Sequence, residues 1–209
     1  MDCKVISISR ALAAGGEEIG RDIASRLGFR FVDDEIVSRA AEKAGVSPET
    51  IEKVERTPRL IDRILRYMGS APVDTGAYIP SPSELSPAFE TFIEQVIRQT
   101  AAQGNVVIVA HAASIPLAGT PGLLRVLITG SPEARSARLT ASLGEKDRGR
   151  AKKAVEDSDR ERRDYLQRYY NIREEQPSHY DIVLNTDVLS FSTAAEIVVA
   201  AAKASDGPA

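Results

Sequence analysis

Short runs of apolar residues alternate with longer amphipathic segments along most of this chain. The short runs are rich in β-branched residues, which favour buried strands. The longer segments repeat apolar residues at helical spacing, as Ile19, Ile23 and Leu27 do, which predicts helices with one buried face. Strands are expected at residues 5–8, 29–32, 106–109, 123–128 and 181–184.

Local signals indicate where the helices begin and end. Gly28 stops the segment 17–27, and Ser131 followed by Pro132 provides an N-cap and a proline in the first turn. Helices are expected at residues 17–27, 34–43, from 47 onward, 59–68, 89–102, 131–168 with interruptions near Gly144 and Gly149, and 191–204. The proline-rich segment 69–87 is expected to be an irregular loop, and residues 205–209 a frayed tail.

This alternation predicts an α/β fold whose mostly parallel sheet is covered on both faces. Ligands of such sheets bind beyond the carboxyl ends of the strands. The loops at those ends are residues 9–16, 33–39, 110–121 and 129–135.

Composition narrows the classes of function. The chain has 209 residues and a net charge of −3, which argues against a nonspecific nucleic-acid binder. We expect no membrane span, because no long apolar run is present, and no secretory signal. The single cysteine, Cys3, is expected to be a small core residue of a cytoplasmic protein.

The stretch 4–20 has the layout of a phosphate-binding loop: a strand, a turn containing Gly15 and Gly16, and a helix start. The lysine and hydroxyl of the usual G-x-x-x-x-G-K-[ST] pattern are missing, so a plain tight turn is nearly as good an explanation. Glu17 and Glu18 suit the helix dipole, but they would repel an anion bound there.

Two other groups of residues could carry chemistry. Asp33 ends a predicted strand, where it could meet a sugar hydroxyl, a metal ion or a phosphate acceptor, and Arg39 could hold a phosphate. Considered singly, an N-cap aspartate and a solvated arginine are the favoured interpretations. The charged run 157–170 is typical of a solvated helix face. Phosphoryl transfer, however, needs several arginines around the moving group, which an arginine-rich helical hairpin could supply.

The chain resembles the cytidylate-kinase-like branch of the P-loop nucleoside monophosphate kinases. The matches lie in the opening strand and loop 6–19, the stretch 27–39, the Asp159–Tyr169 pattern D-R-x-R-x-x-Y-x-x-x-Y, and the closing strand 180–190. The resemblance implies one P-loop NTPase-type three-layer α/β/α domain over residues 1–209, with a five-stranded sheet. Its expected parts are a core of residues 1–33, 85–130 and 173–205, a monophosphate-binding insertion of residues 34–84, and a helical lid of residues 131–172.

The resemblance also implies transfer of the γ-phosphoryl group of ATP, with Mg²⁺, to a nucleoside monophosphate, with CMP or dCMP as the first candidate. Two alternatives stay open: a kinase of another small acceptor, and a weak or inactive nucleotide-binding pseudokinase that acts through interaction. The apolar face of segment 59–68 would suit internal packing, which is favoured, or pairing in a homodimer.

Residue roles carry over from the matching positions. Catalysis is expected to involve Asp33, Arg135, Arg160 and Arg162, and the acceptor to contact Asp33, Arg39, His111 and Asp159, with no protein ligand for a metal. The donor nucleotide is expected at Ser9, Arg10, Ala13, Ala14, Gly15, Gly16, Glu17 and Glu18.

The chain departs from the family pattern at several positions of the phosphate-binding loop and at one position after the third strand. Gly16 stands in place of the loop lysine, which this branch commonly lacks, and Ala13 and Ala14 replace a Gly-Ser pair. Glu17 and Glu18 occupy the place of a magnesium-binding hydroxyl. His111 replaces an arginine, and a neutral imidazole binds an anion more weakly than a guanidinium does.

Overall fold

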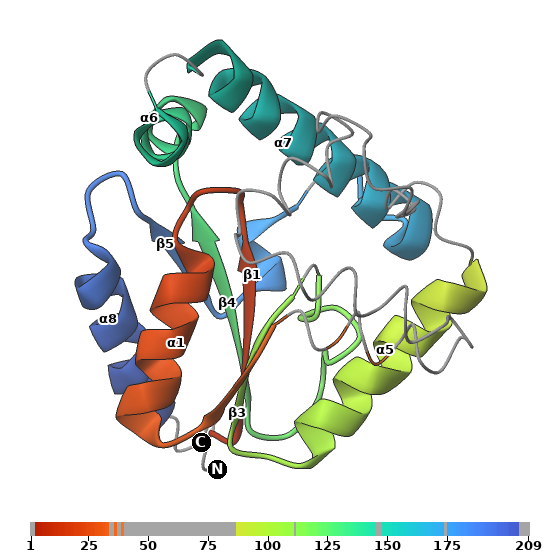
Figure 1. Ribbon diagram of the computed structural model, residues 1–209. Coiled ribbons are helices and arrows are strands. Elements are labelled where there is room, and N and C mark those ends of the chain that lie inside the picture. The colour runs from red at the N-terminus through yellow and green to blue at the C-terminus, as the bar shows by residue number, and fades with distance from the viewer. Residues whose placement is uncertain are drawn as a thin grey trace.

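The computed structural model describes residues 3–33, 36, 39, 87–110, 112–144, 148–173 and 175–204. Its centre is a five-stranded sheet in the order β2-β3-β1-β4-β5, in which every neighbouring pair is parallel. The strands are β1 (Val5–Arg10), β2 (Arg30–Val32), β3 (Val106–Val109), β4 (Leu123–Thr129) and β5 (Ile182–Asn185). Because all strands run the same way, their carboxyl ends share one edge of the sheet, which is the upper edge in Figure 1.

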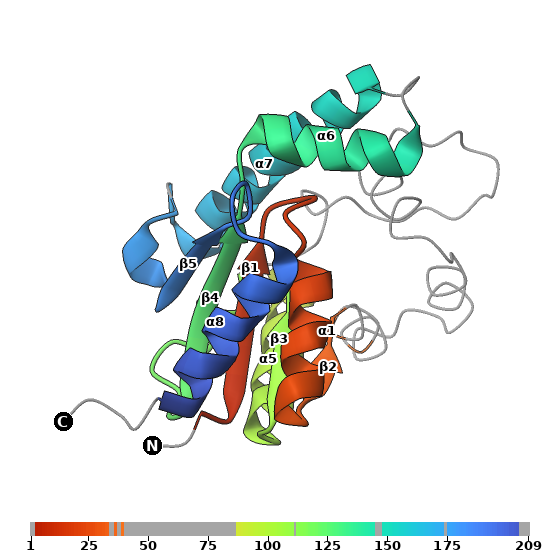
Figure 2. The ribbon, with the colours of Figure 1, turned by 90° about the vertical axis from the view of Figure 1, so that its left-hand side faces the viewer.

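Helices cover both faces of this sheet. Helices α1 (Gly16–Leu27) and α8 (Phe191–Ala204) pack on one face, and α5 (Pro87–Ala102) packs on the other (Figures 1 and 2). The layers confirm the predicted three-layer α/β/α fold. None of the helices in the described residues is both long enough and apolar enough to cross a membrane.

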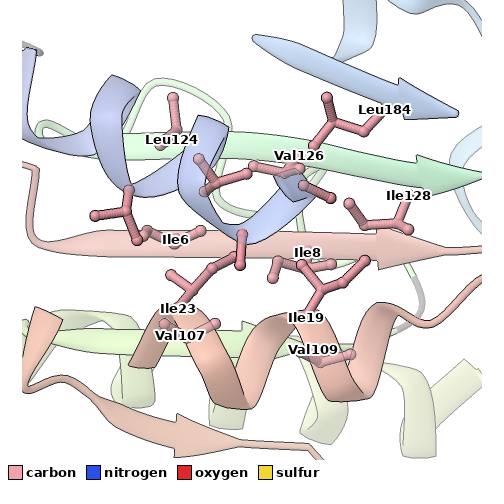
Figure 3. Close-up of a cluster of buried hydrophobic side chains, with 14 of the residues drawn as sticks. Ile6, Ile8, Ile19, Ile23, Val107, Val109, Leu124, Val126, Ile128 and Leu184 are labelled. Atoms are coloured by element: carbon pink, nitrogen blue, oxygen red, sulfur yellow. The ribbon is translucent and has the colours of Figure 1, made fainter. Parts of the chain in front are cut away.

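The main core lies between the sheet and the pair α1 and α8. Figure 3 shows Ile6 and Ile8 of β1 pointing toward Ile19 and Ile23 of α1. These four isoleucines are fully buried, so alternate residues of β1 and one stripe of α1 form a single apolar contact. Cys3 packs at the border of this core, as expected for a small apolar side chain, and burial raises the pKa of its thiol.

Two further helices lie beyond the carboxyl ends of the strands. Helix α6 (Pro132–Leu143) follows β4, and α7 (Arg148–Tyr170) crosses above the ends of the central strands (Figures 1 and 2). They pack on each other through a small apolar cluster, which consists of Leu139, Ala151, Ala154 and Val155. We call α6 and α7 the lid helices. A short 3-10 helix, η2 (Pro177–His179), leads from the lid back to β5.

The predicted elements agree with the structure in most places. Ser131 caps α6 by accepting a hydrogen bond from the N–H of Ala134, and Gly28 ends α1 in the left-handed conformation. The interruption expected near Gly144 and Gly149 is confirmed, because α6 ends at Leu143 and α7 begins at Arg148, with Gly149 in its first turn. The predicted helices 59–68 and from 47 onward, nearly all of the predicted loop 69–87, and the predicted tail 205–209 lie outside the described residues. Of the predicted helix 34–43, the structure describes Ile36 and Arg39, and both are helical.

Candidate functional site

The loop of residues 10–16 joins β1 to α1 and requires glycine at two positions. Gly15 has φ 87°, in the left-handed region, and a Cβ there would overlap the Phe191 ring at the start of α8. A Cβ on Gly16 would come within 2.5 Å of the Arg10 Cβ. The chain therefore passes between Phe191 and Arg10 with no room for a side chain at either glycine.

Side chains from outside the loop hold its carbonyl groups. The Arg10 carbonyl accepts from Arg162 at 3.1 Å, and the Ala14 carbonyl accepts from the Thr186 hydroxyl at 3.1 Å. Between them, Arg135 donates to Leu12 O at 3.4 Å and Arg138 to Ala13 O at 3.3 Å. The lid helices and the end of β5 thus fix the conformation of the loop through its acceptors.

Several N–H groups of the same loop, in contrast to its carbonyl groups, have no hydrogen-bond partner in the described part of the chain. Ala11 and Ala14 donate within the backbone, but no acceptor for the N–H groups of Ala13, Gly15 and Gly16 is found in the described part of the chain. Such N–H groups at the start of a helix carry the partial positive charge that binds phosphate. The loop therefore has the backbone of a phosphate cradle, although its side chains depart from the usual pattern.

Glu17 does not add a free negative charge to this helix start. Its carboxylate accepts from Arg10 Nε at 2.7 Å, with both side chains mostly buried. Burial on its own raises the pKa of Glu17, but the charge and hydrogen bond of Arg10 outweigh burial and hold the pKa below its ordinary value. Arg10 therefore neutralises the charge with which Glu17 would repel an anion at the helix start. Glu18, the other glutamate of this turn, is exposed to solvent.

Arg135 connects the lid helices to the loop. It is only 3% exposed, and its guanidinium pairs with Asp159 on α7 through Nη1–Oδ1 at 2.9 Å and Nη2–Oδ2 at 2.6 Å. Its Nε donates to Gly130 O at 2.9 Å, and Nη1 also reaches Leu12 O. These contacts occupy most of the donors of Arg135, so in this arrangement the side chain acts as a structural bridge.

Arg162 forms the second buried connection. Its Nε and Nη2 donate to the two carboxylate oxygens of Glu175 at 2.9 and 2.6 Å, and the Tyr180 hydroxyl donates to the same carboxylate. The remaining nitrogen, Nη1, holds the Arg10 carbonyl. Arg162 therefore links α7, the start of the loop 10–16 and the segment that precedes β5.

A cavity of about 210 Å³ opens between the loop and α7. Its floor includes Leu127 and Thr129 of β4, so it lies on the face of the sheet opposite the main core. The lining residues are Ala11, Leu127, Thr129, Arg135, Asp159, Arg162, Arg163 and Glu175. Arg163 is exposed and has no ion-pair partner among the described residues, so it gives the cavity an excess of positive charge.

Of the residues singled out in the sequence, the structure brings Arg135, Asp159 and Arg162 together at this cavity. Arg160 lies elsewhere on α7, where it pairs with Asp157 and its side chain is 60% exposed. Asp33 lies at the end of β2, accepts from Arg21 at 3.2 Å, and is absent from the cavity lining. Arg39 is half-buried, and His111 lies outside the described residues.

Ser9 has an unusual position among the predicted site residues. It is fully buried, and its hydroxyl has no hydrogen-bond partner in the described part of the chain. Its register partner on the neighbouring strand β4 is Leu127, which lines the cavity, so Ser9 lies next to the cavity floor in the sheet. An unpaired buried hydroxyl costs stability, and it is a candidate partner for a bound polar group.

Sequence reasoning missed several residues of this region. Arg138 lies one helical turn after Arg135, and this spacing was a usable signal. Arg138 donates to Thr186 Oγ1 at 3.1 Å and lies 5.5 Å from the Phe191 ring centre. Thr129 begins the predicted strand-end loop 129–135, and that position was its signal. Glu175 had no such signal, because it reaches the cavity through the fold rather than through a local pattern. In the part of the chain that the structure describes, no group of three His, Cys, Asp or Glu side chains could hold a metal ion.

Comparison with solved structures shows a shared fold. A crystal structure of an uncharacterized protein from Eubacterium ventriosum is 15% identical, with a TM-score of 0.68 over 96% of this chain and 99% of that chain. A shikimate kinase from Bacteroides thetaiotaomicron is 13% identical, with a TM-score of 0.51 over 95% of each chain. A sugar kinase from Janibacter sp. is 14% identical, with a TM-score of 0.51 over 94% of this chain and 92% of that chain.

Sequence comparison gives the family. No curated protein matches the chain. The model of the cytidylate kinase-like family matches residues 5–188, which span every strand and both lid helices. This match supports a kinase-like transferase and agrees with the P-loop kinase fold of the solved structures. The chain therefore belongs to the cytidylate kinase-like family.

Proposed function

We propose that this protein transfers the γ-phosphoryl group of ATP to a nucleoside monophosphate, with CMP or dCMP as the acceptor. The observation that carries the proposal is the state of the loop 10–16. Its carbonyls are held by the lid helices and by Thr186, and N–H groups at the start of α1 have no acceptor in the described part of the chain. In a chain of the cytidylate kinase-like family, this arrangement suits the phosphates of a nucleotide.

The residues around the loop fit a nucleotide better than they fit a protein-bound metal. ATP supplies the γ-phosphoryl group. The N–H groups of Ala13, Gly15 and Gly16 would hold its phosphates, and the two glycines let the loop take this path between Phe191 and Arg10. Glu17 is paired with Arg10, and no hydroxyl begins α1, so we assign Mg²⁺ to the oxygens of the nucleotide rather than to protein ligands.

Arginines of the lid would supply the charge that the loop lacks. Arg162 and Arg163 line the cavity beside the loop and can neutralise oxygens of the moving group. Arg135 would hold the lid on the loop through Asp159 and Leu12 O. On the acceptor side, we assign binding or activation of the acceptor to Asp33 and orientation of its phosphate to Arg39, with His111 in place of the family arginine.

The direct test is to incubate the protein with Mg-ATP and a panel of nucleoside monophosphates and to measure ADP. We expect ADP formation that depends on CMP or dCMP. Arg162→Ala should lower turnover by at least about 100-fold, as loss of a preorganised charged donor does. Arg160→Ala is the matched control on the same helix. Unchanged turnover in both variants would exclude the assigned role of the lid arginines.

Two features favour a second candidate, a nucleotide-binding pseudokinase. Gly16 replaces the loop lysine, and Glu17 forms an ion pair at the place of the magnesium-binding hydroxyl. In that case ATP would raise the melting temperature without any ADP being formed. ADP formed with another small acceptor, but not with CMP or dCMP, would instead identify a kinase of different specificity. Absence of both ADP formation and stabilisation by ATP would contradict every nucleotide-based function.

A further inference from the structure

Glu175 fills the guanidinium fork of Arg162 at the edge of the cavity. The two hydrogen bonds are 2.9 and 2.6 Å long, and the two side chains are 11% and 19% exposed for Arg162 and Glu175 respectively. Tyr180, itself buried, donates its hydroxyl to the same carboxylate. The carboxylate is thus held by two residues, in a place partly shielded from solvent.

This geometry is the one in which a guanidinium binds a phosphate group. A planar fork that donates two parallel hydrogen bonds accepts either a carboxylate or two phosphate oxygens. The third nitrogen of Arg162, Nη1, donates to the Arg10 carbonyl, so the fork that faces Glu175 is the edge formed by Nε and Nη2. A phosphate can therefore use the Arg162 fork only if it takes the place of Glu175.

We propose that Glu175 is an internal competitor for the phosphate group that enters the cavity, and that it makes the site selective for doubly charged anions. A phosphate monoester carries about −1.5 to −2 charges at neutral pH, whereas the Glu175 carboxylate carries about −1. Arg163, which lines the same cavity without an ion-pair partner in the described residues, favours the anion of higher charge. The inference rests on the proposed function only in taking the anion to be a phosphate group.

The test measures binding of inorganic phosphate to the full chain by calorimetry and by melting temperature. Glu175→Gln keeps the shape of the side chain and can still accept from Tyr180, but it removes the competing charge. We expect the Kd for phosphate to fall by about tenfold, the scale of one hydrogen bond to a charged group. We also expect phosphate to raise the melting temperature of this variant more than that of the wild type. A Kd that is unchanged or higher would overturn the proposal.

Asp181→Asn is the matched control. Asp181 pairs with Arg125 at 2.6 Å, the same distance as the shorter Arg162–Glu175 contact, but neither residue lines the cavity. Its phosphate affinity should equal that of the wild type. If Asp181→Asn improves phosphate affinity by the same factor as Glu175→Gln, the gain comes from the lower total negative charge of the protein. The proposal then fails.

Two further variants keep the proposal testable if Glu175→Gln folds poorly. In Glu175→Ala, acetate should raise the melting temperature by refilling the fork, and it should have no such effect on the wild type; no acetate effect on this variant would overturn the proposal. In an Arg162→Ala background, Glu175→Gln should no longer improve phosphate affinity, because the fork is gone. A gain that persists there would also overturn it. None of these readouts needs turnover, so a protein that forms no ADP could still show the exchange at Arg162.

Discussion

The loop of residues 10–16 and the lid helices α6 and α7 differ in where their positive charge resides. In the loop, the charge of Arg10 is paired with Glu17 and Gly16 occupies the position of the usual lysine, so the loop offers mainly the backbone N–H groups at the start of α1. The lid offers the formal charges of Arg135, Arg138 and Arg162, and each of these donates to a loop carbonyl. The lid arginines therefore hold the loop in shape, and under the proposed function they would also supply the positive charge that the loop lacks.

The lid arginines differ in how deeply they are buried, and we expect their roles to differ accordingly. Arg135 is buried and fully engaged, Arg162 is nearly buried and pairs with a carboxylate at the cavity, and Arg163 is exposed. Removing one partner of a buried ion pair lowers the free energy of unfolding strongly, because the other charge stays buried without a partner. Removing one partner of an exposed pair changes the free energy of unfolding little. Variants at these positions therefore separate structural from functional arginines.

The largest effect is expected for Arg135→Ala. This substitution leaves the Asp159 carboxylate without its partner and frees the carbonyls of Gly130 and Leu12. We expect the free energy of unfolding to fall by about 3 kcal/mol, the lower end for a buried pair because Asp159 is partly exposed. Denaturant unfolding followed by circular dichroism measures it.

Arg160→Ala is the control for that prediction, because Arg160 belongs to the same lid but pairs with Asp157 on an exposed face. Arg160→Ala should lower the free energy of unfolding by less than about 1 kcal/mol. Equal losses in the two variants would mean that burial does not separate the lid arginines as we infer.

The next effect concerns the loop itself. Gly15→Ala places a Cβ in the left-handed conformation and against the Phe191 ring. We expect a loss of about 2 kcal/mol together with weaker ATP binding, since both strain and overlap act on the loop. Gly28→Ala has a similar positive φ, but nothing lies within 4 Å of the added Cβ, so it measures strain alone. If Gly28→Ala costs as much, contact with Phe191 contributes nothing.

A smaller effect is expected from the Arg10–Glu17 pair as pH changes. Because Arg10 lowers the pKa of Glu17 in the folded chain, the pair stabilises the fold above the ordinary carboxyl pKa of 4.5. That stability is lost as pH falls from 4.5 through the lower folded pKa. Glu17→Gln should cost about 1 kcal/mol at pH 7 and less at pH 3, because the wild type has then lost the same interaction. A cost that does not change with pH would contradict this assignment.

The smallest effect, and the one of opposite sign, is expected at Ser9. Ser9→Ala removes a buried hydroxyl that has no partner in the described residues, so it should stabilise the free protein by up to about 1 kcal/mol. Ser7 is also buried, two residues further from the loop, and its hydroxyl has no hydrogen-bond partner among the described residues either. We expect Ser7→Ala to give the same gain with no change in ligand affinity, whereas Ser9→Ala should weaken binding of the acceptor or ATP. Identical ligand affinities in the two variants would assign Ser9 to packing.

Most of the fold could be predicted, because its elements carry local signals. Apolar runs gave all five strands to within about two residues, and Ser131 and Gly28 marked helix ends as their chemistry requires. The helix break expected near Gly144 and Gly149 falls between them, and Gly149 itself is helical because α7 begins at Arg148. A glycine costs a helix only about 1 kcal/mol, and packing of Ala151, Ala154 and Val155 against α6 can offset that amount.

The candidate site was predictable only in part. The resemblance to a known family selected Arg135, Asp159 and Arg162, which the structure brings to one cavity. Arg160 and Arg162 were treated alike, yet residues two apart on a helix point about 200° away from each other, so both cannot face one site. Of these two arginines, only Arg162 lines the cavity in the structure.

The sequence by itself determined the strand–glycine turn–helix unit at 4–20, because β-branched runs, glycines and helical spacing act over a few residues. Only the tertiary structure decided how that unit is held and charged. The pairing of Arg162 with Glu175, and the capture of loop carbonyls by arginines more than 120 residues away, join groups with no local relationship. Backbone carbonyls are the same in every residue, so no sequence pattern could mark the ones that the lid would bind.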